Sequence, residues 1–315
     1  MEKRKCTEIC VFRKKRIRWE RILGLILIIA IIYGGINQFK KIDINKQKNE
    51  QESNIQASNN KIEVEIEGNE SQKMKLLIQE LQTKYKLNES NFAFFYYNIQ
   101  EKEYYFYNKD TYFTGASTIK MPIAMTYYDD INEGTLDKEG SLTYKEGCYE
   151  EGNGSTAARY NVGDQVPIKF LIEQSIVNSD NTANNILIEN VGYKETKYKI
   201  ARYAEMDLPE NFYSENITSA QYGYNIVNYL YTHQSKYEEL IGLLKKSSGG
   251  EYLKKYIKEY DVAHKYGSYD GYVHDYGIVF SENPYLIGVY TKGIANANEV
   301  IAKISKKVLE KNKEI

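Results

Sequence analysis

Residues 260–291, YDVAHKYGSYDGYVHDYGIVFSENPYLIGVYT, decide the fold of this 315-residue chain. Three runs within it, at 260–267, 272–280 and 285–291, are rich in aromatic and β-branched residues and are separated by polar turns. This pattern predicts three consecutive strands. Two further aromatic runs, at 91–99 and 103–108, lie on either side of a short polar turn and predict an antiparallel hairpin.

Helical patterns fill the rest of this region. Apolar residues recur at helical spacing in 74–85, a long helical middle is expected from about 117 to 259, and an amphipathic helix is expected from about 295 to 310. Because strands lie at both ends with helices between them, we predict an α+β domain in which the first and last strands join one antiparallel sheet.

Composition narrows the class of protein. A 42% hydrophobic content is sufficient for a sizeable core, which excludes wholesale disorder. The three cysteines, at 6, 10 and 148, cannot form a disulfide scaffold, and no cluster of Cys and His has the spacing of metal ligands. We find no phosphate-binding or dinucleotide-binding motif and expect neither a metal nor a cofactor.

Charge is distributed unevenly along the chain. Residues 1–21 hold nine of the 42 basic side chains and only three of the 43 acidic ones, and the uncharged run 22–39 follows directly. Eighteen residues at ~1.5 Å per residue reach about 27 Å, close to the thickness of the hydrocarbon core of a bilayer. We therefore predict a basic cytoplasmic segment at 1–21 and a transmembrane anchor at 22–39.

The region after the anchor has its own organisation. Residues 40–70 are polar and poor in large apolar side chains, which predicts a disordered linker, and the folded domain is expected at 71–315. The basic flank predicts a single-pass protein whose N-terminus is cytoplasmic and whose folded domain lies outside. A cleaved signal peptide is the alternative, although no small-residue cleavage site is evident. The body is acidic, which argues against nucleic acid as a partner, and we expect a monomer.

One helix start carries candidate chemistry. Ser117 follows the small residues Gly115 and Ala116, and a helix is expected from Ile119 onward. At a helix N-terminus, free N–H groups can stabilise an oxyanion beside the serine oxygen. Lys120 lies three residues on, on the same face, and a desolvated lysine can act as a neutral base. Ser117 and Lys120 therefore form a candidate nucleophile and base that needs no histidine.

The spacing alone is weak, because Ser58 and Lys61 show it within the polar linker. Two further elements strengthen it. Ser179-Asp180-Asn181 lies in a polar turn between apolar helical runs, and Lys265-Tyr266-Gly267 ends a predicted strand. The lysine offers a fixed cation, and the glycine permits close approach of the backbone to a ligand.

In this order, the three elements resemble those of the penicillin-recognising serine enzymes, and more closely the class A β-lactamase-like branch. The resemblance covers about 71–315 and implies a five-stranded antiparallel sheet flanked by helices, together with an all-helical subdomain. It also implies a role for each site residue. Ser117 is the acylated nucleophile, Lys120 its base, Ser179 the proton relay to the leaving nitrogen and Asn181 a ligand for the substrate's side-chain amide. Lys265, with Tyr266 and Gly267, binds the substrate carboxylate, and the backbone N–H groups of Ser117 and Ser268 form the oxyanion hole.

Two departures from the family pattern bear on activity. Tyr266 stands where the family has Thr or Ser, which removes a hydroxyl from the carboxylate site. No intact Glu-x-x-Leu-Asn segment lies between the second and third elements, and the nearest stretches begin at Glu205 and Glu215. Since that glutamate activates the water that clears the acyl-enzyme, its loss predicts slow deacylation.

The sequence thus predicts a membrane-anchored serine hydrolase that acts on amide bonds. The candidate substrates are β-lactams and peptidoglycan stem peptides that end in D-Ala-D-Ala. The alternatives are a penicillin-binding D,D-peptidase of cell-wall metabolism and a β-lactam receptor that does not turn over. A Ser-His-Asp triad using His274 and Asp275 is disfavoured, because neighbours in a strand point to opposite faces.

Overall fold

The computed structural model describes residues 67–152, 154–248 and 252–315. These residues belong to one compact unit, Ile62–Ile315. The predicted anchor at 22–39 lies outside the described residues. Within the described ranges, no helix is both long and apolar enough to cross a bilayer.

A mixed sheet of six strands forms the centre of the domain, in the order β1-β3-β2-β10-β9-β8. The strands are β1 (Asn69–Glu70), β2 (Phe92–Asn98), β3 (Glu103–Tyr107), β8 (Val262–Tyr269), β9 (Tyr272–Val279) and β10 (Tyr285–Lys292). β2 pairs antiparallel with β10, with Phe95 opposite Gly288. The early hairpin and the three late strands therefore share one sheet, which confirms the prediction from the sequence.

The sheet differs from the prediction by one strand. The expected number was five, and the sixth strand is β1, which pairs parallel with β3 at the edge of the sheet. Backbone bonds hold it, from Asn69 N to Lys102 O (2.9 Å) and from Ser71 N to Tyr104 O (2.7 Å). Two polar, exposed residues give no alternating apolar pattern, so the strand is invisible in the sequence, where these positions were assigned to the linker.

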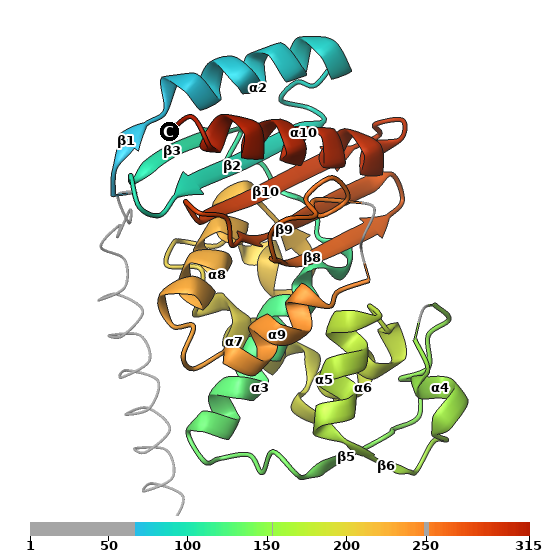
Figure 1. Ribbon diagram of the computed structural model, residues 1–315. Helices are drawn as coiled ribbons and strands as arrows, with labels where there is room; N and C mark the ends of the chain where they lie inside the picture. Colours follow the sequence, from blue (N-terminus) through green and yellow to red (C-terminus); the bar gives the residue numbers. More distant parts are fainter. Residues whose placement is uncertain (1–66, 153, 249–251) are drawn as a thin grey trace, which may run out of the picture. The chain divides into compact units, whose positions relative to one another are not determined.

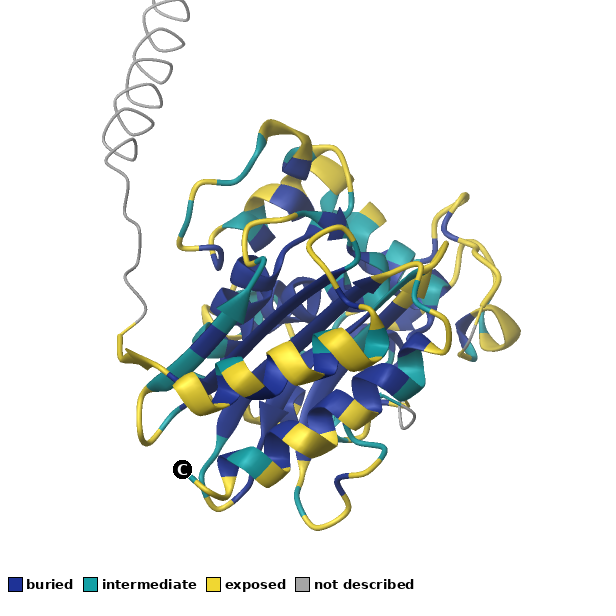
Figure 2. Ribbon diagram, turned by 90° about the horizontal axis from the view of Figure 1, so that it is seen from above, coloured by how far each residue is buried: buried dark blue, intermediate teal, exposed yellow. Residues whose placement is uncertain are grey.

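Helices cover both faces of the sheet (Figure 1). α2 (Gln72–Tyr85) and α10 (Ala297–Asn312) pack together on one face, and α8 (Ala220–Thr232) covers the other. β2 shows why both faces are covered, because Phe94 belongs to the core on the side of α2 and α10, whereas Phe95 belongs to the core on the side of α8. Every residue of β2 is buried, and Figure 2 shows the sheet as a buried layer beneath a partly exposed helix surface.

The helical region between the strands is also confirmed, with two short strand pairs that the sequence did not indicate. These are β4 (Phe113–Thr114) with β7 (Ile217–Thr218), and β5 (Ser141–Thr143) with β6 (Gln165–Pro167). The helices are η1 (Ala116–Ile119), α3 (Lys120–Asn132), α4 (Thr156–Arg159), α5 (Ile168–Val177), α6 (Asn181–Val191), α7 (Tyr193–Ala201), η2 (Glu210–Tyr213) and α9 (Glu238–Lys245). The edge strand β8 packs against η1, so the edge of the sheet meets the start of α3.

Candidate active site

Ser117 lies in a tightly held turn between β4 and α3. It is the second residue of the 3₁₀ turn η1, and the preceding Ala116 has a φ of 47°, in the left-handed region that costs a residue with a side chain about 1–2 kcal/mol. His274 fixes the approach to this turn, because its Nε2 donates to Thr114 O (2.8 Å) while its Nδ1 accepts from Thr291 N (3.1 Å). Burial lowers the pKa of His274 to about 4, so the imidazole is neutral and structural.

Lys120 begins α3 and turns its amine toward the second sequence element. Lys120 Nζ donates to Ser179 O (2.7 Å) and Asn181 Oδ1 (2.6 Å), and it lies 3.3 Å from Ser179 Oγ. Only 3% of Lys120 is exposed, and this burial lowers its pKa to about 8 although the charges of Glu150 and Asp180 act in the opposite direction. A substantial fraction of the amine is therefore neutral near physiological pH.

The two shortest contacts of Lys120 are with oxygens that can only accept. A neutral amine has two hydrogens, so these contacts use both and leave its lone pair available as a base. No hydrogen bond joins Ser117 Oγ to Lys120 Nζ in the described part of the chain. Such bonds often tighten only when substrate is bound.

Ser179 connects both lysines of the site. Its backbone has a φ of 56°, and Asp180 caps α6 by accepting from Ala183 N (3.0 Å), which together place the serine side chain in the cleft. Lys265 Nζ donates to Ser179 Oγ (3.0 Å), the oxygen that lies 3.3 Å from Lys120 Nζ. Since Lys265 donates to this oxygen, the hydroxyl hydrogen of Ser179 is free to be donated elsewhere. The geometry suits a proton relay.

Lys265 is completely buried in β8. Burial lowers its pKa well below the usual value, the positive charge of Lys120 acts in the same direction, and Asp275 acts against them. The amine also donates to Tyr266 O (2.9 Å) and lies 4.3 Å from the centre of the Tyr266 ring. Tyr266 itself stacks on Tyr252, with ring centres 4.8 Å apart. An aromatic pair thus occupies the place where the family resemblance implies a hydroxyl.

Gly267 brings β8 against the nucleophile turn. A Cβ atom at this position would lie 2.7 Å from Ser117 N and 3.0 Å from Thr118 N, so only glycine fits. The backbone of the next residue, Ser268, therefore runs beside the first N–H groups of η1. Free N–H groups at a helix start together with an adjacent strand N–H can bind an oxyanion, as predicted for Ser117 and Ser268.

The structure thus brings together Ser117, Lys120, Ser179, Asn181, Lys265, Tyr266, Gly267 and Ser268, the complete predicted set. The roles of these residues remain predictions from the family resemblance. No group of His, Cys, Asp and Glu among the described residues is arranged to hold a metal ion.

Glu150 makes contacts that sequence reasoning missed. The adjacent pair Glu150-Glu151 has the sequence pattern of solvated surface charge, and Glu150 is exposed, but its two oxygens also accept from Asn181 Nδ2 (2.8 Å) and Asn185 Nδ2 (2.9 Å). Asn181 is therefore held at both ends, by Lys120 on its oxygen and by Glu150 on its nitrogen. The sequence gives no signal for this contact, because 31 residues separate the partners.

A second acidic residue has contacts that the sequence does not indicate. The adjacent pair Asp129-Asp130 has the sequence pattern of solvated surface charge, which is wrong for Asp129, because it is only 2% exposed. Burial alone would raise its pKa, but hydrogen bonds from Lys236, Tyr203 and Tyr237 and the charge of Arg202 lower it instead. Asp129 joins the end of α3 to the segments after α7 and before α9. Its role is to hold the helical region together.

The contacts of His274 and Asp275 agree with the interpretation that these two residues do not form a Ser-His-Asp triad. Asp275 does not pair with its neighbour His274 but with His264, whose Nδ1 lies 2.8 Å from Asp275 Oδ2. Both members of this pair are fully buried, behind Lys265. Asp275 also accepts from Leu253 N (3.0 Å), so the pair anchors the segment before β8.

A family model described as the β-lactamase enzyme family matches residues 74–311. This chain belongs to that family. It lies within the superfamily of penicillin-recognising serine enzymes, as the three sequence elements predicted.

Solved structures of the family share the fold. PBP-A superposes with a TM-score of 0.67 at 21% identity, covering 76% of this chain and 97% of that one. A β-lactamase from Sphaerobacter thermophilus gives 0.65 at 19% identity, with 77% and 97% covered. The extended-spectrum β-lactamase TLA-1 gives 0.65 at 19% identity, with 76% and 99% covered. At these identities the likeness establishes the fold of a class A β-lactamase-like serine hydrolase.

Proposed function

We propose that this protein is acylated at Ser117 by β-lactams or by amides resembling D-Ala-D-Ala, and that it clears the acyl group slowly. The observation that carries the proposal is the environment of Lys120, a buried amine with a pKa of about 8 at the start of the helix that follows Ser117. Its hydrogen bonds to Ser179 and Asn181 leave a lone pair for the proton of Ser117. A variant of PBP-A, of the same fold, has been captured as an acyl-enzyme with penicillin G.

The acylation step follows from these contacts. Lys120 takes the proton of Ser117 as Oγ attacks the carbonyl carbon, and the N–H groups of Ser117 and Ser268 stabilise the oxyanion. The C–N bond then breaks, and Ser179 donates its free hydrogen to the departing nitrogen. Lys120, now protonated and 3.3 Å from Ser179 Oγ, returns the proton to this oxygen, while Lys265 Nζ, which donates to it, stabilises the charge that develops there.

Slow deacylation is supported by the segment between the second and third elements. The residue of this segment that reaches the nucleophile turn is Asn216, which donates from Nδ2 to Ala116 O (2.8 Å). Glu205, Glu210 and Glu215 are all exposed. An amide cannot take the proton of an attacking water as a carboxylate can.

The two carboxylates whose charges act on Lys120 have other partners. Asp180 caps α6 and accepts from Thr156 N (3.0 Å), and Glu150 accepts from two asparagine amides. We therefore infer an acyl-enzyme that lasts longer than that of an efficient β-lactamase.

Intact-mass analysis after exposure to penicillin G tests the proposal. Wild-type protein should gain the mass of one ligand, Ser117→Ala should gain none, and the wild-type adduct should persist for minutes or longer. A matched Ser268→Ala variant keeps the backbone N–H and should still be acylated. Rapid return of the wild-type protein to its original mass would contradict slow deacylation, and an adduct on Ser117→Ala would contradict the nucleophile.

A D,D-peptidase is the second candidate, and it is favoured over an efficient β-lactamase because Glu205, Glu210 and Glu215, which lie between the second and third elements, are all exposed. Release of D-alanine from an acyl-D-Ala-D-Ala peptide would support it. A persistent adduct without release of D-alanine would favour a receptor instead.

The membrane anchor and the location of the domain belong to the same proposal. They are supported by the uncharged run at 22–39 directly after nine basic residues. Full-length protein should remain with the membrane after alkaline washing, and external protease should release the domain from spheroplasts. Release by alkaline washing would contradict the anchor, and protection from external protease would contradict the orientation.

A further inference from the structure

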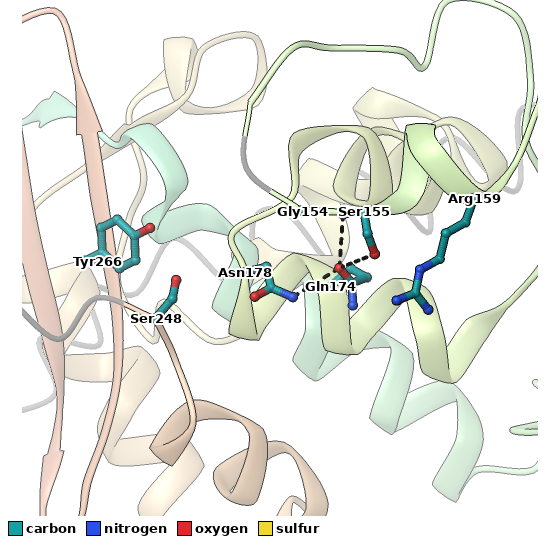
Figure 3. Close-up of a pocket in the computed structure, with 7 residues that line it drawn as sticks. All are labelled: Gly154, Ser155, Arg159, Gln174, Asn178, Ser248 and Tyr266. Atoms are coloured by element: carbon teal, nitrogen blue, oxygen red, sulfur yellow. Dashed lines mark hydrogen bonds between the residues drawn. The ribbon is translucent and has the colours of Figure 1, made fainter.

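An open polar cavity of about 610 Å³ adjoins the catalytic cleft (Figure 3). Its lining includes Ser155, Arg159, Gln174, Asn178, Ser248 and Tyr266. Figure 3 shows Tyr266 and Ser248 on one side and Arg159 on the other, with the side-chain amides of Asn178 and Gln174 between them. Cavities of about 300–1,000 Å³ hold drug-sized molecules, so this one exceeds the needs of a single departing alanine.

The cavity flanks one particular side of the reaction centre. Asn178 directly precedes Ser179, and Tyr266 directly follows Lys265. Asn181, for which the family resemblance implies contact with the substrate's side-chain amide, does not belong to the lining, and neither does Glu150, which accepts from it. Since Ser179 would protonate the departing nitrogen, the cavity lies where the leaving group extends away from the broken bond.

Gln174 presents an unpartnered donor in this lining. Only 8% of the residue is exposed, and its Oε1 accepts from Ser155 N (3.3 Å), Ser155 Oγ (3.2 Å) and Asn178 Nδ2 (3.0 Å). These bonds orient the amide so that Oε1 is fully used. No hydrogen bond engages Nε2 within the described ranges, which leaves two N–H groups for an acceptor on a ligand.

Arg159 is the one charged side chain among the described residues of the lining. It ends the short helix α4, and its guanidinium carbon lies 5.5 Å from the centre of the Phe170 ring on α5. Stacking on an aromatic ring restricts the guanidinium while its hydrogen-bond donors remain available. Figure 3 shows this exposed guanidinium and the amide of Gln174 in the lining of the same cavity, and guanidinium and amide N–H groups are donors that suit a carboxylate.

We propose that this cavity is a leaving-group subsite for a peptide segment that carries a carboxylate. The proposal rests on the acyl transfer proposed above. When the bond from Ser117 Oγ to the carbonyl carbon forms, the C–N bond breaks, the nitrogen takes a proton from Ser179, and the freed amine remains in the cavity until it dissociates. The preferred substrate is thus a peptide whose departing amino acid is longer than alanine and acidic.

Three peptides with the same acyl half and different leaving groups test the subsite. The leaving groups are D-alanine, D-2-aminohexanoate and D-2-aminoadipate, and the last two differ only in a terminal carboxylate. We expect kcat/KM for the aminoadipate peptide to exceed that for the aminohexanoate peptide by about fivefold, the effect of one partly exposed ion pair. A wild-type ratio near one would overturn the subsite.

Variants assign the preference to named residues. Arg159→Gln should bring the ratio close to one, and Gln174→Glu, which keeps the size of the side chain but adds a negative charge, should bring it below one. Lys169→Gln is the matched control, because Lys169 lies on α5 and pairs with Glu139 outside the cavity. This control should keep the wild-type ratio. An unchanged ratio in Arg159→Gln would overturn the assignment.

Formation of the penicillin adduct distinguishes a failure of the subsite from a failure of the proposed function. If wild-type protein forms the adduct and cleaves the peptides without regard to the carboxylate, only the subsite is wrong. If it forms the adduct but cleaves none of the peptides, the cavity does not serve a leaving group. If it neither forms an adduct nor cleaves a peptide, the proposed function fails and the subsite with it.

Discussion

Two parts of the molecule bury a lysine amine to a similar degree and surround it differently. Lys120 in the cleft and Lys197 on α7 are 3% and 1% exposed, and burial lowers the pKa of each to about 8. Lys120 contacts a hydroxyl, a carbonyl and a side-chain amide beside Ser117. Lys197 donates to Glu215 O (2.9 Å) and lies 3.9 Å from the centre of the Phe212 ring.

The comparison shows that a lowered pKa reports burial rather than catalysis. Both amines are poised to lose a proton near neutral pH, but only Lys120 has a nucleophile beside it in the sequence and a relay hydroxyl within reach. Lys197 packs its amine between a backbone carbonyl and an aromatic ring at η2. The partners of the amine, and not its pKa, therefore separate the two roles.

The largest expected effect is the difference in acylation rate between a variant that lacks the amine of Lys120 and one that lacks the amine of Lys197. Lys120→Met should slow acylation by penicillin G by about 10³-fold, the usual loss for a general base. Lys197→Met should leave the rate within about threefold, because, among the described residues, the partners of its amine are Glu215 O and the Phe212 ring, not Ser117 or Ser179. The rates come from intact-mass time courses, with thermal unfolding to confirm that both variants fold. A comparable loss of rate in both variants would show that Lys120 and Lys197 do not differ in their role in acylation.

A third buried charge, Asp129, differs from both lysines because four side chains compensate it. Asp129→Asn should lower the free energy of unfolding by about 3 kcal/mol at neutral pH, since it removes the buried charge that accepts hydrogen bonds from Tyr203 and Tyr237 and pairs with the partly exposed Arg202 and Lys236. The lowered pKa of Asp129 means that its stabilising contribution is present above the unfolded pKa and is lost as the pH falls through the folded value. Urea unfolding at pH 7 and at pH 3 measures the difference between variant and wild type.

The expected result is a smaller difference at pH 3 than at pH 7. Asp130→Asn, at the neighbouring position, is the control and should cost less, because the Asp130–Lys199 pair is partly exposed. Equal costs for the two variants would mean that the compensated network adds nothing beyond a surface ion pair.

The effect of Lys197 on stability is opposite in sign and smaller. Its folded pKa of about 8 lies below the usual 10.5, so unfolded protein binds more protons between these values and stability rises with pH there. At pH 7 the buried charged amine is costly, and Lys197→Met should stabilise the protein by about 2 kcal/mol after the loss of its two contacts. The gain should shrink as the pH approaches 10. A gain independent of pH would show that packing, not charge, is responsible.

The contrast between local and long-range contacts also explains what the sequence could predict. The strands at 91–108 and 260–291 and the helix start at Ser117 are encoded by nearby residues, through alternation and the small residues before the serine. Their order along the chain was enough to identify the family, and the structure brings all eight predicted site residues together. β1 was missed because backbone bonds alone hold its two polar residues.

The contacts of Glu150 and Asp129 were missed for a different reason. Each carboxylate acts on residues at least 31 positions away, and an acidic residue in a polar turn has the same local pattern whether it ends in solvent or in a network. Sequence spacing defines which residues share a helix face, but not which distant amide or cation will meet that face.

The smallest expected effect is on the pH dependence of acylation, and it depends on Glu150. The base must be neutral, so the rate should rise with pH and level off near the Lys120 pKa of about 8. Burial lowers this pKa, and the charges of Glu150 and Asp180 raise it. Glu150→Gln removes one raising charge, so the midpoint should fall by about half a unit.

Glutamine at position 150 can still accept one hydrogen bond from an asparagine amide, so this variant removes the charge of the side chain while keeping its shape. Glu151→Gln, at the neighbouring exposed position, is the control and should keep the wild-type midpoint. A midpoint that moves equally in both variants would show that any nearby surface charge shifts the pKa of Lys120, without a special role for Glu150. A midpoint that moves in Glu150→Gln alone would show that a carboxylate bound to Asn181 adjusts the base that Ser117 needs.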